Sequence, residues 1–150
     1  SIMTNLILQK RRPIIYGNGE QIRNFSDIDD CIYCLDKLIT DQKIVSQIFN
    51  IGPDEDSITI NELYKIICNK LQFNEPAEYV DERPNEVKHA ICSSDKARKY
   101  LNYKTSIKLS DSIDRVIAYI KENGAKKFDY NHELEINNKL TPETWKNQKF

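Results

Sequence analysis

Two turn-rich segments of the chain each place an arginine beside aromatic or acidic side chains. The first is Tyr16–Phe25, with the sequence YGNGEQIRNF, and the second is Arg83–His89, with the sequence RPNEVKH. The planar fork of an arginine matches two oxygens of a phosphate, and turn residues let backbone amides approach the same anion. Arg23 and Arg83 are therefore candidate phosphate ligands, and the ring of Tyr16 can offer a face to a nucleobase.

A simpler alternative is that both arginines form ion pairs within the chain, which would leave no ligand to explain. On composition alone this alternative is favoured, because surface ion pairs are common and contribute little. The carboxylates nearest in sequence are Asp29 and Asp30 for Arg23, and Glu82 and Glu86 for Arg83.

Other chemical motifs are weak or absent. Cys31 and Cys34 form a CxxC without a second one, and neither His89 nor His132 stands at a zinc-finger spacing. We expect these cysteines to serve as small apolar residues of a helix. Gly17–Asn18–Gly19 lacks the third glycine of a dinucleotide-binding loop, and there is no GKS or GKT, GxSxG or HExxH motif. The pattern therefore predicts no catalytic group and no metal site.

The composition excludes several classes of partner. The 150 residues carry 22 basic and 23 acidic side chains, so a net charge of −1 gives no broad attraction to nucleic acid or to an acidic membrane. No apolar run approaches the roughly 20 residues that span a bilayer. The segment 1–12 does not resemble a signal peptide, because its basic cluster follows the apolar stretch. We expect a cytoplasmic protein that binds neither nucleic acid nor membrane.

Short strand-like runs alternate with helical patterns, which favours an α/β fold with a small mixed sheet and about five helices. Thr59 and Glu62 have the spacing of a capping box, which predicts a helix start. The predicted helices cover residues 2–10, 29–40, 63–71, 95–101 and 109–123, and the predicted strands cover 13–16, 21–28, 47–51 and 77–81.

Periodicity fades after Gly124, although the remaining segment still contains several aromatic residues, including Phe128 and Trp145. A disordered tail would contain fewer aromatics. We therefore predict two parts: a ligand-binding domain over 1–124, and an extended C-terminal arm over 125–150 that packs on the body of the protein or on a partner.

The order of the motifs resembles the extended short-chain dehydrogenase/reductase family of nucleotide-sugar epimerases and dehydratases, particularly its UDP-glucose 4-epimerase-like members. The resemblance covers roughly residues 2 to 123. It is carried by Ile15–Phe25, Asp29–Asp30, Phe49–Gly52, Ile58–Leu63, Arg83–His89, Ser94–Arg98 and the long helix that ends near Lys121.

The resemblance implies a role for each candidate site residue. Arg23 and Arg83 fall on the two arginines that contact the pyrophosphate of the substrate, and Glu86 on the acidic residue that reaches the ribose hydroxyls. Tyr16 falls where the chain packs near the base. The implied fold is the C-terminal substrate-binding portion of a Rossmann-type enzyme. NAD is expected in the complete family enzyme and not in this chain, so the chain alone is not expected to be active.

Three positions depart from the family pattern. Asn24 replaces a common aspartate, Asp27 a common tyrosine or histidine, and Asn85 a preferred glycine. Asparagine tolerates positive φ, so Asn85 can still make the turn. The charge of Asp27 has no such explanation from sequence.

Three functional hypotheses remain open at this point. The chain is the substrate-binding part of an NAD-dependent epimerase or dehydratase, a separately encoded subunit that completes a Rossmann half, or a non-catalytic nucleotide-binding module. In the second case the apolar N-terminal helix and the aromatic arm would form the interface. Strand edges left unpaired would favour a homodimer.

Overall fold

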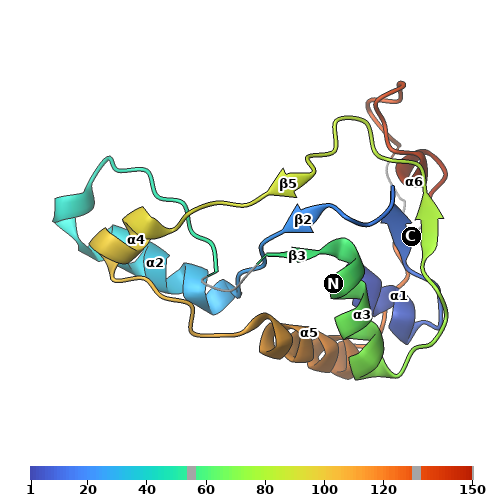
Figure 1. Cartoon of the computed structure of the whole chain (residues 1–150), viewed down its shortest axis with the longest axis horizontal. Helices are drawn as coiled ribbons and strands as arrows, with labels where there is room; N and C mark the ends of the chain where they lie inside the picture. The colour runs from blue at the N-terminus through green and yellow to red at the C-terminus, as the bar shows by residue number, and fades with distance from the viewer. Residues whose placement is uncertain (54–56, 130–132, 150) are drawn as a thin grey trace.

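The computed structural model describes residues 1–53, 57–129 and 133–149. His132 and the last residue of the arm therefore lie outside the described residues. Six α-helices, one 3₁₀ helix and five short strands occur in the described chain. They form a broad body at one end and a narrower lobe at the other (Figure 1).

Three helices pack together to form the core of the body. They are α1 (Ile2–Leu8), α3 (Ile60–Leu71) and α5 (Leu109–Asn123). The apolar side chains of α3 and α5 recur at helical spacing, so each helix has one face to bury. The buried cluster consists of Ile7, Ile67, Cys68, Ile113 and Ile117.

The ends of α3 and α5 are set by local sequence, as predicted. The Thr59 side chain accepts a hydrogen bond from the Glu62 amide, and the Glu62 side chain accepts one from the Thr59 amide, which completes the capping box. Gly124 follows α5 with φ +78°, a conformation that other residues rarely adopt.

The strands form two small sheets. In the body, β1 (Ile14–Tyr16) runs parallel to β4 (Glu78–Val80), with Tyr16 opposite Val80. In the second sheet, β2 (Ile22–Arg23) lies between β3 (Ile58–Thr59), which is antiparallel to it, and β5 (His89–Ala90), which is parallel to it. The mixture of parallel and antiparallel pairs confirms the predicted mixed α/β architecture.

The lobe is built from α2 (Ile28–Thr40), the 3₁₀ helix η1 (Gln42–Ile44) and α4 (Asp95–Leu101). The second sheet leads from the body into this lobe (Figure 1). The lobe has its own small core, which consists of Cys34, Ile44, Ala97, Leu101 and Tyr103.

The C-terminal arm, described over residues 125–129 and 133–149, contacts the body at both ends. Its start is held by α1, because Asn5 donates to the Lys126 carbonyl at 2.7 Å and accepts from the Lys126 amide at 3.0 Å. Its end is held by Arg11, which donates to the Lys149 carbonyl at 3.1 Å. Between them lies the one-turn helix α6 (Glu143–Lys146), which the weak periodicity of this segment did not predict.

The predicted strand over 47–51 is wrong: these residues form no strand or helix. No strand of the described chain pairs with them, and an extended apolar run becomes a strand only where a neighbouring strand shares its backbone hydrogen bonds. The strand predicted over 21–28 is limited to Ile22–Arg23, because α2 already begins at Ile28. The strands β3 and β5 were not predicted, since two residues give no period.

Within the residues that the structure covers, no helix has both the length and the apolar character needed to cross a membrane.

Candidate functional site

The two arginine-bearing segments meet because β1 and β4 run in the same direction. Tyr16 ends β1, and the loop after β4 carries Arg83, so both residues leave the same edge of this parallel pair. The Gly17 amide donates to the Val80 carbonyl at 2.8 Å and extends the pairing by one bond. The topology thus brings together two segments that are distant in the sequence.

The turn after β1 requires its glycines. Gly17 has φ +61° and Gly19 has φ +75°, which L side chains rarely adopt. A Cβ atom at Gly19 would lie 2.1 Å from the Asn61 side-chain oxygen. Asn61 itself holds the turn, because it donates to the Asn18 carbonyl at 2.9 Å and to the Glu20 carboxylate at 2.6 Å.

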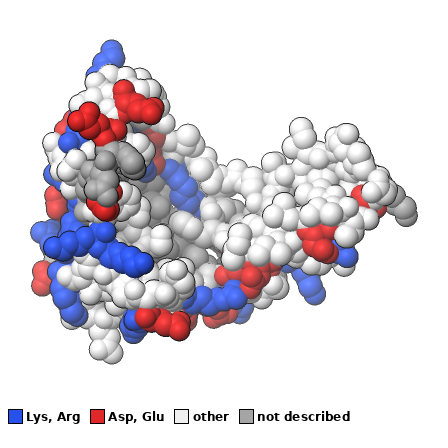
Figure 2. Space-filling view, turned by 180° about the vertical axis from the view of Figure 1, so that it is seen from behind, with Lys and Arg blue, Asp and Glu red and all other residues white. Residues whose placement is uncertain are grey.

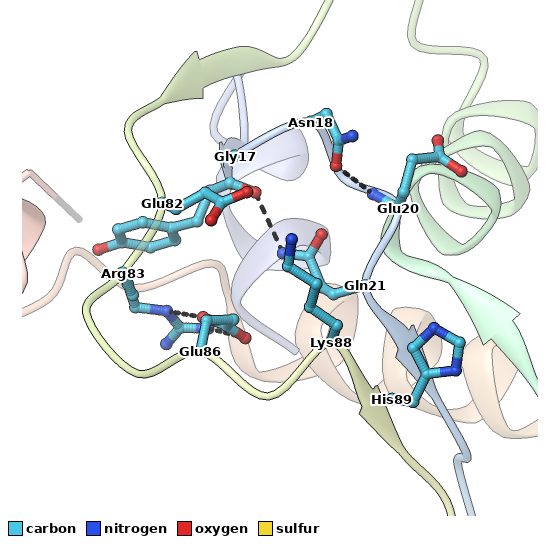
Figure 3. A pocket seen from close by; sticks show the side chains of 10 residues that line it. Gly17, Asn18, Glu20, Gln21, Glu82, Arg83, Glu86, Lys88 and His89 are labelled. Atoms are coloured by element: carbon cyan, nitrogen blue, oxygen red, sulfur yellow. Dashed lines mark hydrogen bonds and ion pairs between the residues drawn. The ribbon is translucent and has the colours of Figure 1, made fainter.

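The turn after Arg83 is made by Asn85, whose φ is +60°. An asparagine in place of glycine therefore keeps the left-handed conformation, as the sequence suggested. The Glu86 amide donates to the Arg83 carbonyl at 3.2 Å and closes the turn. As a result, the side chains of Arg83 and Glu86 lie side by side (Figure 3).

Glu86 accepts hydrogen bonds from both candidate arginines. Arg23 Nη2 lies 2.5 Å from Glu86 Oε1, Arg83 Nε lies 2.6 Å from Oε2, and Arg83 Nη2 lies 3.1 Å from Oε1. The carboxylate is 13 % exposed, so these bonds are poorly screened by water. Arg83 thus pairs with one of its sequence neighbours, while the alternative in which Arg23 pairs with Asp29 or Asp30 is wrong.

Tyr16 contacts Arg83 through its ring. The Arg83 guanidinium carbon lies 4.5 Å from the centre of the Tyr16 ring, within the range of a cation–π interaction. One face of this ring is therefore occupied by a cation. Its hydroxyl forms a hydrogen bond with the hydroxyl of Thr144 in α6.

A cavity of about 190 Å³ opens among these residues. Its lining includes three of the four predicted residues (Tyr16, Arg83 and Glu86), whereas Arg23 lies behind Glu86 and is connected to the cavity through it. The other lining residues are Gly17, Asn18, Glu20, Gln21, Glu82, Lys88 and His89 (Figure 3).

Sequence reasoning did not assign several polar groups that line this cavity, among them Lys88 and Gln21. Lys88 adds a second lining cation, and Gln21 is oriented by donating to the Tyr16 carbonyl at 3.1 Å. Gln21 and Lys88 lie within the two arginine-bearing segments. Their closeness in sequence to Arg23 and Arg83 was the signal that could have identified them. The lining carries two cations, Arg83 and Lys88, and three carboxylates, Glu20, Glu82 and Glu86. The cations can bind an anion, and the carboxylates can accept hydrogen bonds from hydroxyl groups.

Asp27, whose charge was unexplained from sequence, caps α2 and ties it to α5. It accepts from the Asp29 amide at 3.1 Å, from the Ser112 hydroxyl at 2.6 Å and from Arg115 Nη1 at 2.9 Å. The hydrogen bond from Ser112, with further help from Arg115, lowers the pKa of the Asp27 carboxyl below its ordinary value. This position is therefore structural.

The CxxC cysteines lie in α2, as expected. Cys34 is fully buried, and burial raises the pKa of both the Cys31 and the Cys34 thiols. A raised thiol pKa disfavours the thiolate that redox chemistry and metal binding require. Across residues 1–53, 57–129 and 133–149, no cluster of histidine, cysteine and acidic residues could hold a metal ion.

The Gly17–Asn18–Gly19 turn leads into β2 and not into a helix. A dinucleotide-binding loop places the pyrophosphate at a helix N-terminus. This turn therefore lacks the geometry that an NAD pyrophosphate needs, and it serves instead as one wall of the cavity.

The curated proteins that resemble this chain include nucleotide-sugar epimerases. A Methanocaldococcus jannaschii protein assigned as a UDP-glucose 4-epimerase is 32 % identical over 123 residues, which are 82 % of this chain and 39 % of that protein. The UDP-glucuronate 4-epimerase of Thermodesulfobacterium geofontis is 27 % identical over 117 residues, 77 % of this chain and 36 % of that protein.

The fold agrees with the sequence comparison. The crystal structure of UDP-glucuronic acid 4-epimerase from Bacillus cereus, in complex with UDP-glucuronic acid and NAD, matches with a TM-score of 0.77 and 25 % identity. The match covers 82 % of this chain and 39 % of that one. No protein-family model matches the chain. The chain thus spans 36–39 % of the length of these relatives, and it matches their C-terminal part.

Proposed function

Because the chain belongs to the extended short-chain dehydrogenase/reductase family of nucleotide-sugar epimerases and dehydratases, we propose that its cavity binds the nucleoside diphosphate of a nucleotide sugar. The observation that carries the proposal is the convergence of Arg23 and Arg83 on Glu86. Two guanidinium groups offset the charge of a diphosphate, and a carboxylate can accept hydrogen bonds from two vicinal ribose hydroxyls.

The ligand-free network holds the binding groups in place. Arg23 and Arg83 each already have one side of the fork on Glu86, which limits the freedom that they would lose on binding. Arg23 Nη1 also donates to the Ile22 carbonyl at 2.8 Å, so Arg83, which lines the cavity, is the better placed of the two to donate to phosphate oxygens. Lys88 adds a cation on the same cavity wall, and Tyr16 contributes its ring beside the base.

The size of the cavity predicts a rearrangement on binding. Its volume of about 190 Å³ is below the roughly 300 Å³ from which ligand pockets usually start. A whole nucleoside diphosphate therefore requires part of the Arg83–Glu86 contact to open.

In this proposal the chain supplies the substrate-binding part of an NAD-dependent epimerase or dehydratase. NAD supplies the hydride chemistry in such an enzyme. The described residues offer it no suitable phosphate loop, so we assign the cofactor and the catalytic residues to the part of the relatives that this chain does not span. The chain alone would bind substrate without turning it over.

A second possibility is that a separate polypeptide completes the enzyme. One observation favours it: α2 exposes an apolar stripe at helical spacing, formed by Ile28, Ile32, Leu35 and Ile39, each at least half exposed. A stripe of this kind suits a protein partner, either a Rossmann half or a second copy of the chain. A reading frame for GxxGxxG directly upstream in the DNA would favour one continuous enzyme, and its absence would favour a separate subunit or a non-catalytic module.

We also propose a cytoplasmic location. All four cysteines are free thiols, which agrees with a reducing compartment.

A thermal melt with UDP, dTDP, GDP and CDP tests the proposed function. A ligand that binds only the folded state raises the melting temperature by mass action, so one diphosphate should raise it and thereby identify the base. Inorganic phosphate at the same concentration is the control for a general anion effect. A cooperative melt that none of the four diphosphates changes would contradict the proposal.

A further inference from the structure

The C-terminal arm reaches the back of the candidate site. Thr144, in α6, is 1 % exposed and is one of the few buried polar residues of the chain. Its hydroxyl forms a hydrogen bond with the Tyr16 hydroxyl. Figure 1 shows α6 beside the β1–β4 pair, where Tyr16 ends its strand.

A continuous line of contacts runs from the arm to both arginines. Thr144 contacts the Tyr16 hydroxyl, the Tyr16 ring lies under the Arg83 guanidinium at 4.5 Å, and Arg83 donates to Glu86 at 2.6 Å. Arg23 completes the line at 2.5 Å from Glu86. A change at Thr144 therefore acts on the phosphate-binding forks through the orientation of one aromatic ring.

Open space lies beside the Tyr16 ring. A second cavity, of about 410 Å³, lies between the arm and the loop that carries Arg83, and it is bordered by Tyr16, Arg83 and Thr144. If the Tyr16 ring turned into this space, the Arg83 guanidinium would lose its cation–π contact with the ring. The position of Thr144 is itself fixed, because the Trp145 amide donates to the Pro142 carbonyl and closes the turn of α6.

We propose that Thr144 is a positioning residue for nucleotide binding: through Tyr16 it holds Arg83 in the orientation that receives the diphosphate. The proposal rests on the proposed function, and it makes the arm part of the binding site. Thr144 contacts no ligand itself in this account.

Calorimetric titration of the full chain tests the proposal, with the nucleoside diphosphate that raises the melting temperature most. Thr144→Val removes the hydroxyl at nearly constant volume and should weaken binding roughly fivefold, the usual effect of one neutral hydrogen bond. Thr144→Ser keeps the hydroxyl and should bind nearly as the wild type does. Thr40→Val is the matched control, because the Thr40 hydroxyl bonds only within α2, in the lobe.

Tyr16→Phe tests the same bond from its other end, and it remains informative if Thr144→Val fails to fold. It should weaken binding by a similar factor, and adding Thr144→Val to it should cause no further loss. Wild-type affinity in both single variants would overturn the positioning role while leaving the proposed function intact. Losses that multiply in the double variant would also overturn it, since the two hydroxyls would then act independently. A wild-type chain that binds none of the diphosphates would overturn the proposed function first, and this role with it.

Discussion

The body and the lobe each contain a long amphipathic helix, but they treat its apolar side differently. In the body, α5 buries Ile113, Ile117 and Ile120 against its neighbours. In the lobe, α2 buries Cys34 and leaves Ile32 and Ile39 exposed, the latter by 78 %. Two helices with similar apolar periodicity therefore differ in burial: the apolar face of α5 is packed inside the body, and much of that of α2 is exposed.

The distribution of charge follows the same division. On the face seen in Figure 2, charged side chains crowd the body at the left, whereas the lobe at the right is largely uncharged. Charged residues keep a surface in water, and an uncharged apolar one favours contact with protein. We propose that the exposed apolar stripe of α2 is the surface that a further polypeptide covers.

The largest expected effect tests whether stability resides in the body. Ile67 is 4 % exposed and lies in the core of the body. Ile67→Ala should therefore leave a cavity and lower the free energy of unfolding by about 3 kcal/mol. Ile39→Ala, on the exposed stripe, should change it by less than about 0.5 kcal/mol. Urea denaturation of both variants measures the two values. Equal losses would mean that the stripe is buried in solution, for example in a dimer.

A second pair of variants compares the arginines of the two regions. Arg83→Ala should weaken binding of the nucleoside diphosphate by about 1.5–3 kcal/mol, the usual contribution of charge-assisted hydrogen bonds. Arg98→Ala in the lobe is a close control. The Arg98 side chain is 39 % exposed, against 40 % for Arg83, and each arginine pairs with a carboxylate three residues away in sequence. Calorimetric titration should show no change for Arg98→Ala. An unchanged affinity for Arg83→Ala would remove that residue from the site.

The smallest effect concerns the junction between the two regions, where Asp27 joins α2 to α5. Folding lowers the pKa of this carboxyl, so its stabilising contribution is present above the ordinary aspartate value of about 3.9 and disappears as the pH falls through the lowered value. Asp27→Asn should therefore cost about 1 kcal/mol at pH 7, and the difference from wild type should shrink as the pH falls through the lowered pKa. Unfolding curves across this range measure it.

Asp29→Asn provides the control for that pH series, because Asp29 pairs with the same Arg115 but is 49 % exposed. Its effect at pH 7 should be smaller than that of Asp27→Asn. A larger effect for Asp29→Asn would show that the exposed ion pair, and not the buried cap, joins the lobe to the body.

Local signals predicted much of this architecture. The Thr59–Glu62 capping box, Gly124 and the periodicity of residues 109–123 act within a few residues of the chain, so the sequence is enough to place them. The turn at Asn85 was predictable for the same reason, because its conformational preference is local.

Features that depend on distant partners were not predictable. The segment 47–51 has the composition of a strand but no partner in the described chain, and Thr144 meets Tyr16 only because the arm returns to the β1–β4 pair. The choice of Glu86 over Asp29 as the partner of Arg23 likewise depends on β2 lying beside β5. Single-sequence patterns carry no information on such contacts.

The most direct test of the central claim is a titration of the ¹⁵N-labelled chain with the nucleoside diphosphate that raises its melting temperature, followed by amide chemical shifts. The account predicts saturable shifts at Gly17–Arg23 and Arg83–His89, with little change in α2 of the lobe. Shifts concentrated in α2, or none in the two arginine-bearing segments at millimolar ligand, would contradict the assignment of this cavity as the nucleotide site.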